Sequence, residues 1–168
     1  MKQAARILAP VMAATLVLAA AGAAQAQAVR SERNMSLELA NQIAGATVAA
    51  CLAGGYNVTA AVVDRAGQLR ALQRADNAGP HTVGAAQGKA YTSASARNTT
   101  AAMLENVQKN PGAATLVDIP GFLILGGGVP VKVGNEVIGA VGVGGAPGGH
   151  LDEQCANAGI AKVAELLK

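Results

Sequence analysis

Apolar residues recur at helical spacing over residues 35–53, where the sequence is MSLELANQIAGATVAACLA. The periodic positions, three and four residues apart, are Leu37, Ala40, Ala44, Val48 and Cys51. Ser36 is suited to cap the N-terminus with Glu38 in the first turn, and Gly54-Gly55 ends the pattern. This segment therefore predicts an amphipathic helix.

Two later segments follow the pattern of β-hairpins. Residues 58–63 are rich in β-branched side chains, DRAG supplies a turn, and residues 68–73 alternate polar and apolar positions. Residues 129–145, VPVKVGNEVIGAVGVGG, repeat the pattern with Gly134-Asn135 at the tip. The sequence thus predicts two hairpins, one in each half of the domain.

The region between the hairpins changes from a loop to an alanine-rich helix at His81. A break is expected near Asn98, followed by a second short helix that Pro111-Gly112 ends. After a Pro-Gly turn, the apolar run Phe122 to Leu125 predicts a short strand. Residues 151–167 predict a closing amphipathic helix. Its inward positions are Ala156, Ile160, Val163 and Leu167.

Two hairpins and one further strand indicate a mainly antiparallel sheet of about five strands, with the terminal helices packed on one face. The fold class is therefore α+β. Because no internal period of about 20 to 50 residues is present, solenoids and propellers are not expected.

The strand predicted over residues 137–143, VIGAVGV, has two unlike faces. Alternation places Val137, Gly139, Val141 and Val143 on one face, and Ile138, Ala140 and Gly142 on the other. The second face is small enough for a helix or a flat ligand to approach closely.

The chain begins with a pattern typical of a secretory signal peptide. Lys2 and Arg6 flank the start of an apolar run that ends in the small-residue tract AAQAQA, and cleavage after Ala26 or Ala28 fits equally well. A retained membrane anchor is the alternative, but the run is short for a bilayer span and Pro10 interrupts it. We expect residues 1–28 to be cleaved, leaving residues 29–168 as one periplasmic or secreted domain with no stable membrane insertion.

Loss of the signal segment changes the charge balance. Lysine and arginine fall from 13 to 11 because Lys2 and Arg6 are removed, while 10 acidic residues remain, so the net charge falls from +3 to about +1. No block of like charges is present, and two Tyr, one Phe and no Trp are available for base stacking. These features argue against nucleic-acid binding.

The two cysteines, Cys51 and Cys155, lie in the first and last predicted helices. In an oxidising compartment they are a candidate disulfide that would tie these helices together. The alternative is two small buried side chains, because the sequence does not show that the Cα atoms come within bonding reach. A metal site is less favoured, since no CxxC motif or Cys/His cluster accompanies them.

The side chains best suited to a ligand site gather around the alanine-rich helix. His81, in GPHT, can point into a cleft or simply cap the helix. Lys89 and Tyr91 lie in GKAYTSA among very small residues, and Arg97 and Thr99-Thr100 follow about two turns later. Polar groups beside an apolar slot suit a large flat ligand.

Other motifs fit known site chemistry poorly. The segment GAPGGH lacks the Lys-Ser/Thr of a P-loop, and Asp152 and Glu153 would repel an anion at the next helix start. His150 is expected to be a solvated loop residue. The serines lack a GxSxG elbow and neither histidine has an obvious orienting acid nearby, so nucleophilic catalysis is not predicted.

Three long segments together resemble the GlcG/HbpS haem-binding family. They are AVVDRAGQLRALQRADNAGPHTVGAAQGKAYTSA, DIPGFLILGGGVPV and VIGAVGVGGAPGGHLDEQCANAG. The similarity runs from about residue 36 to the C-terminus and includes VVD-x-x-G, KA-aromatic-T, GG-x-PV, IGA-x-GV and DEQ-x-A in this order. DIPG and GAPGG make the chain most similar to the extracytoplasmic, HbpS-like branch.

The resemblance implies a profilin-like fold with a five-stranded antiparallel sheet, assembly into homo-oligomers that are often octamers, and haem binding, sometimes with haem breakdown or iron handling. Members of this family differ in the iron ligand, a His in some and a Thr in others. Carried over by position, His81 is the first candidate for the ligand and Thr100 the second. Lys89, Tyr91 and Arg97 complete the expected haem-binding set.

Three functions remain open at this stage. The leading hypothesis is an exported protein that sequesters haem or delivers it to a partner. A small enzyme, either haem-degrading or an isomerase or lyase on small organic acids, is the second, suggested by Lys89, Tyr91 and Arg97. An accessory partner of an envelope sensor or transporter is the third. The sequence does not decide whether the protein is an enzyme.

Overall fold

A computed structural model describes residues 28–168 of the 168-residue chain. The chain divides into two compact units, residues 1–31 and residues 32–168. In the first unit, residues 28–31 are described and are irregular and exposed. Apart from Ala28, the predicted signal peptide lies outside the described residues, so its cleavage stays a prediction.

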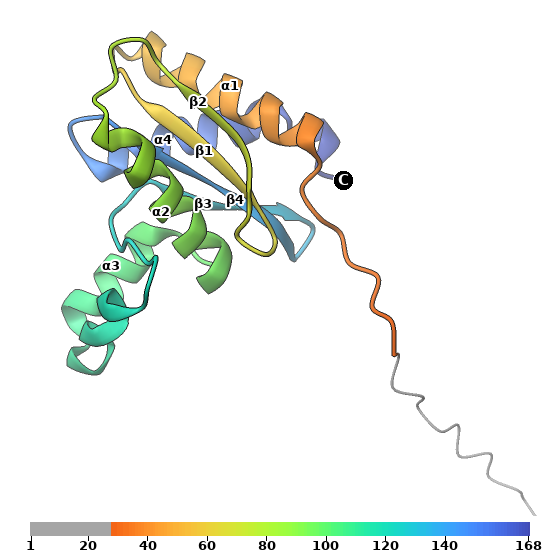
Figure 1. Ribbon diagram of the computed structural model, residues 1–168, viewed down its shortest axis with the longest axis vertical. Coiled ribbons are helices and arrows are strands. Elements are labelled where there is room, and N and C mark those ends of the chain that lie inside the picture. Colours follow the sequence, from red (N-terminus) through yellow and green to blue (C-terminus); the bar gives the residue numbers. More distant parts are fainter. Residues whose placement is uncertain (1–27) are drawn as a thin grey trace, which may run out of the picture. The chain divides into compact units, whose positions relative to one another are not determined.

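The second unit contains four helices, four strands and two short 3₁₀ segments (Figure 1). In chain order they are α1 (Leu37–Ala53), β1 (Thr59–Asp64), β2 (Leu69–Arg74), α2 (His81–Ala96), α3 (Thr100–Lys109), η1 (Pro111–Asp118), β3 (Gly128–Val133), β4 (Glu136–Gly144), α4 (Gly149–Lys162) and η2 (Ala164–Leu166). Both predicted hairpins are present, and Ser36 caps α1 by accepting a hydrogen bond from Leu39 N at 3.1 Å.

The strands form one antiparallel sheet in the order β2-β1-β4-β3. Helices α1 and α4 pack against each other and cover one face, and α2 lies across the opposite face (Figure 1). The larger hydrophobic core lies beneath α1 and α4 and includes Ile43, Val62, Val141 and Val143. The described chain is therefore an α+β domain of three layers. The α+β class and the packing of the terminal helices on one face are as the sequence predicts.

The expectation of about five strands is wrong, because the described sheet has four. The run Phe122 to Leu125, predicted as the fifth, is irregular. Its backbone forms hydrogen bonds with side chains and not with a neighbouring strand. Leu123 N donates to Thr92 Oγ1 at 2.7 Å, and Leu125 O accepts from Thr100 Oγ1 at 2.7 Å. These two helix hydroxyls supply partners that a strand would otherwise find in a sheet.

The C-terminal helix is shorter than predicted. Helix α4 ends at Lys162, and the chain continues in the 3₁₀ turn η2, where Leu166 N donates to Val163 O at 2.9 Å. This tightening is common at helix ends. The prediction of which side chains face inward is confirmed. Ala156 and Val163 are buried, and Ile160 and Leu167 pack against the larger core.

Strand β4 departs from simple alternation. Val131 pairs with Gly139 but Lys132 pairs with Val137, so Ile138 is an extra residue relative to β3. Ile138 therefore joins the larger core, although alternation placed it on the opposite face. Ala140 does face α2, in a small cluster with Val63, Ala90 and Ala94.

The small face of β4 is covered directly by α2, so no ligand slot exists between them. A Cβ on Gly142 would lie 2.1 Å from Ala86 O and 2.4 Å from Ala90 N. The sequence allowed either a helix or a flat ligand to approach this face of β4, and in the structure it is the helix. The small side chains of α2 that could leave room for a ligand are therefore those on its other faces.

The candidate disulfide is confirmed. Cys51 of α1 and Cys155 of α4 are bonded, with their Cα atoms 5.3 Å apart and 104 positions apart in sequence. Next to it, a Cβ on Gly159 would lie 2.0 Å from Thr47 Oγ1, so α1 and α4 approach closely. The first and last helices are thus joined both covalently and by close packing.

Candidate functional site

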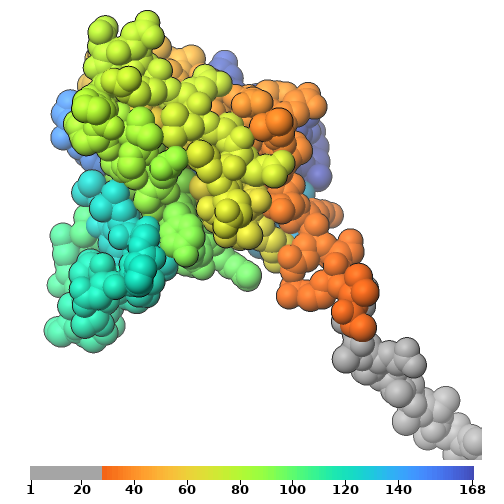
Figure 2. All heavy atoms as spheres, in the orientation of Figure 1, coloured from red at the N-terminus to blue at the C-terminus, as the bar shows by residue number. Residues whose placement is uncertain are grey.

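The outer face of α2 forms one side of an open groove of about 420 Å³, here called the α2 groove. Its lining residues are Val63, Gly67, Leu69, Gly84, Gln87, Gly88, Tyr91 and Gly121. Gly84 and Gly88 leave two successive turns of the helix without side chains, and nothing lies within 4 Å of a Cβ built on Gly84. Figure 2 shows this face of α2, in green, between the first hairpin and the segment after η1.

His81 begins α2 and lies one turn before Gly84. The spacing of His81, Gly84, Gly88 and Tyr91 is three, four and three residues, which places them along one face of the helix. The imidazole is exposed and lies over Gly79, where a Cβ would be 2.7 Å from His81 Cε1. His81 thus stands at the N-terminal end of the face that forms the groove.

Tyr91 stands at the other end of the α2 groove, as a residue that lines it. Its ring packs on the glycines of two loops. A Cβ built on Gly67 would lie 2.7 Å from the ring, and a Cβ built on Gly121 would lie 3.2 Å from it. It meets the ring of Phe122 edge to face, with the centroids 6.2 Å apart. The tyrosine remains 36% exposed and is available to a ligand.

Lys89 points away from the groove and into the protein. It is 2% exposed, and its Nζ donates to Asp152 Oδ2 and to Val143 O, each at 2.8 Å. Burial raises the pKa of the Asp152 carboxyl, opposed by the hydrogen bond and charge of Lys89 and by the amide of Ala146. Lys89 therefore joins α2 to β4 and α4.

Thr100 is also occupied within the fold. It is fully buried, and its Oγ1 donates to Leu125 O at 2.7 Å and accepts from Gly128 N at 2.8 Å. Its neighbour Thr99 caps α3 by accepting from Ala102 N at 3.2 Å. The structure thus places the Thr100 hydroxyl in the link between α3 and the start of β3, away from the α2 groove.

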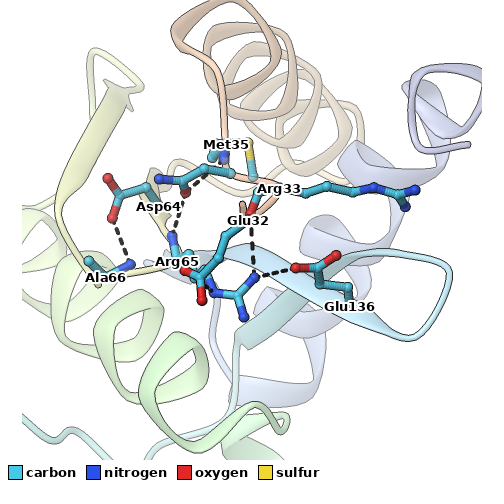
Figure 3. Close-up of polar contacts among 8 residues, drawn as sticks. Glu32, Arg33, Met35, Asp64, Arg65, Ala66 and Glu136 are labelled. Carbon is cyan, nitrogen blue, oxygen red and sulfur yellow. Dashed lines mark hydrogen bonds and ion pairs between the residues drawn. The ribbon is translucent and has the colours of Figure 1, made fainter. Parts of the chain in front are cut away.

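Arg97 ends α2 in the left-handed conformation, with φ of 54°, and is exposed. It lines a separate cavity of about 300 Å³ with Glu32, Asn34, Arg65 and Ala66. Here the Arg65 guanidinium lies between Glu32, at 3.3 Å, and Glu136 (Figure 3). The hydrogen bond from Arg65 lowers the pKa of Glu136. This cluster fastens the chain before α1 to the first hairpin.

A second large cleft, of about 480 Å³, lies between α3 and α4 and is called the α3–α4 cleft. It shares no lining residue with the α2 groove. His150, expected to be a solvated loop residue, is exposed and lines this cleft, but it lies in the first turn of α4 and not in a loop. Glu153 lies one turn further along the helix. Burial raises the pKa of the Glu153 carboxyl.

Of the five predicted site residues, Tyr91 lines the α2 groove, His81 shares its helix face, and Lys89, Thr100 and Arg97 lie elsewhere. The sequence indicated that α2 consists largely of residues with very small side chains. The glycines Gly84 and Gly88, four residues apart, are the sequence signal from which the groove could have been predicted. Val63 and Leu69 gave no such signal.

Within residues 28–168, no group of three or more His, Cys, Asp or Glu side chains is arranged to hold a metal ion. A search of the same residues finds no helix able to span a bilayer.

The sequence model of one protein family, described as “Haem degrading protein HbpS-like”, matches residues 35–161. Protein GlcG of Escherichia coli (strain K12) is 39% identical over 109 residues, which cover 62% of this chain and 80% of GlcG.

Two solved structures are similar to the fold. A double mutant of Streptomyces reticuli HbpS is 37% identical and superposes with a TM-score of 0.76, covering 94% of this chain and 99% of HbpS. A PduOC complex with haem is 23% identical, with a TM-score of 0.68, and covers 76% of this chain and 94% of PduOC. At that identity the PduOC likeness shows the fold alone.

Proposed function

This chain belongs to the HbpS-like family, and on that premise we propose that it binds haem in the α2 groove. The observation that carries the placement is the groove on the outer face of α2, where the space at Gly84 is open and the exposed His81 lies one turn earlier on the same helix face. Haem binding is also what the PduOC structure records for a protein of the same fold.

The groove has features that a porphyrin requires. A flat apolar ring system needs a surface without protruding side chains, and the two glycines of α2 provide one. Val63 and Leu69 supply apolar contacts, and the Tyr91 ring supplies an aromatic surface at one end. The groove is open on its outer side, so a ligand larger than its volume can extend into solvent.

His81 is the proposed iron ligand. Neutral imidazole is a common haem-iron ligand, and His81 is exposed and lies on the same face of α2 as Gly84, Gly88 and Tyr91. The Thr100 hydroxyl, by contrast, is committed to Leu125 O and Gly128 N. Tyr91 is proposed to orient the ring. The bound iron would supply redox chemistry, while the described side chains bind and position the porphyrin.

The test is a haemin titration of the purified protein, followed by the Soret absorption band. We expect saturable binding in the wild type, loss of the ligand-specific Soret position in His81→Ala, and at least about tenfold weaker binding in Gly84→Leu, which corresponds to about 1.4 kcal/mol. Gly84→Leu is informative because open space surrounds its Cβ, so the leucine fills the groove without disturbing the core.

His150→Ala is the matched control, since it removes the other exposed histidine from a different cleft. Its spectrum should equal that of the wild type. Loss of the Soret shift in His150→Ala but not in His81→Ala would place the haem in the α3–α4 cleft and overturn our assignment. An unshifted wild-type spectrum would overturn haem binding itself.

Export and a role in haem sequestration or delivery complete the proposal. The N-terminal sequence pattern supports secretion, and the Cys51–Cys155 disulfide is stable in an oxidising compartment such as the periplasm. A mature N-terminus at residue 27 or 29 in the periplasmic or secreted fraction would support export. Delivery predicts transfer of bound haem to apomyoglobin faster than haemin dissociates into buffer, and sequestration predicts transfer no faster than that dissociation.

A homo-oligomer is also proposed, because large apolar side chains remain exposed on the region after α3. Val117 is 54% exposed and Ile119 is 40% exposed. Such a patch is typical of an interaction surface. Native mass spectrometry of the haem-free and haem-loaded protein gives the number of subunits, and a monomer under both conditions would contradict this part.

Haem degradation is the second candidate function, favoured by the description of the matched family. The polar side chains that line the α2 groove are Gln87 and Tyr91, so the described residues offer no carboxylate or imidazole within its lining for acid–base work. Incubation of the haem complex with ascorbate in air distinguishes the two functions. Release of iron with loss of the Soret band indicates degradation, and an unchanged band indicates binding alone.

A further inference from the structure

The α3–α4 cleft is a second concave surface, and two helix faces form its walls. The residues of α3 and α4 that line it recur at helical spacing. They are Ala101, Leu104, Glu105 and Gln108 on α3, and Gly149, His150, Glu153, Gln154 and Asn157 on α4, with Leu125 and Gly126 completing the lining. Its volume of about 480 Å³ is within the range of small-molecule sites.

The carboxyl of Glu153 has an oxygen that accepts no hydrogen bond from the described residues. Its side chain is partly exposed, but the Oε2 atom is shielded from solvent and has no hydrogen-bond partner among the described residues. Burial raises the pKa of this carboxyl. An unsatisfied buried acceptor costs about 1–3 kcal/mol, more when it is charged. Such groups are uncommon in folded proteins and call for an explanation.

The side chains around this carboxyl are mostly uncharged. The lining holds no lysine or arginine, and its other titratable side chains are Glu105 of α3 and the exposed His150 of α4. Lys109 pairs with Glu105 on the exposed side of α3 and is not part of the lining. The remaining surface combines the apolar side chains of Leu104 and Leu125 with the amides of Gln108, Gln154 and Asn157. A matching ligand thus carries a hydrogen-bond donor with positive charge and an apolar body.

We propose that the α3–α4 cleft binds a small organic ammonium ion, with its N–H group donating to Glu153 and its hydrocarbon part against Leu104 and Leu125. A divalent metal ion fits less well, because the described residues contain no cluster of three metal-ligating side chains. The site is independent of haem binding, since the two clefts have no lining residue in common.

The test is a titration with n-butylammonium, followed by the backbone amide signals of the full protein in nitrogen-15 NMR spectra. Butan-1-ol and butanoate are the neutral and anionic controls of similar size. We expect n-butylammonium to shift signals of α3 and α4 and to bind at least about tenfold more tightly than butan-1-ol, because a hydrogen bond between two charged groups is stronger than one from a neutral hydroxyl. Butanoate should not bind.

Glu153→Gln keeps the shape of the side chain and removes its charge, so it should weaken n-butylammonium about tenfold and leave butan-1-ol unchanged. Ala101→Leu fills the cleft from α3 and should reduce binding of both. Glu38→Gln, on exposed α1, is the control for a general charge effect and should change neither. Equal binding of butan-1-ol and n-butylammonium, unchanged affinity in Glu153→Gln, or shifts confined to other elements would overturn the proposal.

Discussion

The two faces of the sheet are held together by different interactions. Under α1 and α4 lies the larger core, with Ile43, Val62, Val141 and Val143, and a disulfide joins the two helices. Under α2 the hydrophobic cluster is small, consisting of Val63, Ala90, Ala94 and Ala140. Burial of apolar area stabilises the first face, and close backbone approach with polar bonds stabilises the second.

Polar contacts join α2 to its surroundings along its length. Thr82 Oγ1 lies 2.7 Å from Thr59 Oγ1 of β1, Lys89 reaches Asp152, and Thr92 accepts from Leu123 N. Short side chains and one lysine thus hold the helix against the sheet. The buried side chains of α2 are thus short ones and Lys89, while Gly84, Gly88 and Tyr91 on its outer face form one side of the α2 groove.

The α2 groove and the main hydrophobic core therefore lie on opposite sides of the sheet. Substitutions beneath α1 and α4 are expected to alter stability with little effect on the groove. Substitutions in α2 can alter either, depending on whether they lie on its inner or its outer face.

Gly142→Ala is expected to have the largest effect, with a loss of more than about 4 kcal/mol in the free energy of unfolding, or no folded protein. The added methyl group would lie 2.1 Å from Ala86 O, so α2 would have to move away from β4. Urea unfolding followed by circular dichroism measures the change. Gly144→Ala is the control, because its Cβ would lie 3.2 Å from Ala85 Cβ, and its loss should stay below about 1.5 kcal/mol. Similar losses in both would refute close packing as the cause.

Lys89→Met should cost about 3–5 kcal/mol, because it leaves the Asp152 carboxylate buried without its cation. The double variant Lys89→Met/Asp152→Leu removes both charges and should recover much of this loss. Thermal and urea unfolding of the single and double variants provide the measurement. If Lys89→Met is as stable as the wild type, the ion pair does not hold α2 in place.

Reduction of the Cys51–Cys155 disulfide should lower the free energy of unfolding by about 2–4 kcal/mol, because the bond closes a long loop of the unfolded chain. Unfolding with and without a reductant measures the difference, and Cys51→Ala/Cys155→Ala should no longer respond to the reductant. The disulfide lies on the face opposite α2. Haemin affinity at a temperature where both forms are folded should therefore be unchanged, and a large change would show that the faces are coupled.

Gly84→Ala should stabilise the protein by about 0.5–1 kcal/mol, because alanine is the better residue inside a helix and open space surrounds this position. Gly88→Ala is a useful contrast, since its Cβ would lie 3.0 Å from Leu123 Cβ and the gain should be smaller or absent. Calorimetric melting of the two variants tests the difference. A destabilised Gly84→Ala would mean that this face is not open.

Glu153→Gln should have the smallest effect, and its sign depends on pH. Burial raises the pKa of Glu153 above 4.5 in the folded state, so ionisation above that pH costs stability. Glutamine avoids this cost, and we expect a rise of no more than about 2 °C in Tm at pH 7. The gain should disappear below pH 4.5, where the carboxyl is protonated in both states. A gain that persists at low pH would have another cause.

Much of the secondary structure could be predicted from the sequence because its signals are local. The Ser36 cap, the Gly134-Asn135 tip and the break near Asn98 depend on residues adjacent in the chain, and all three are confirmed. The run Phe122 to Leu125 had the composition of a strand. Its partners, Thr92 and Thr100, lie about 25 to 31 residues away, so composition alone could not reveal them.

The site was predicted only in part, for the same reason. Tyr91 and the small-residue character of α2 were visible in the sequence. The inward direction of Lys89 was not, because its partner Asp152 is 63 positions away. The sequence likewise offers the Thr100 hydroxyl as a candidate ligand. In the structure this hydroxyl donates to Leu125 O, in the loop before β3, and accepts from Gly128 N, at the start of β3.

The sequence by itself determined the helices, the two hairpins, the α+β class and the pair of cysteines available for bonding, because these follow from spacing and turn chemistry. Only the tertiary structure decided that four strands form the sheet, that α2 covers Gly142, and which polar side chains are buried. Those outcomes depend on which distant groups satisfy each backbone donor and buried charge, and that choice is made when the elements pack together.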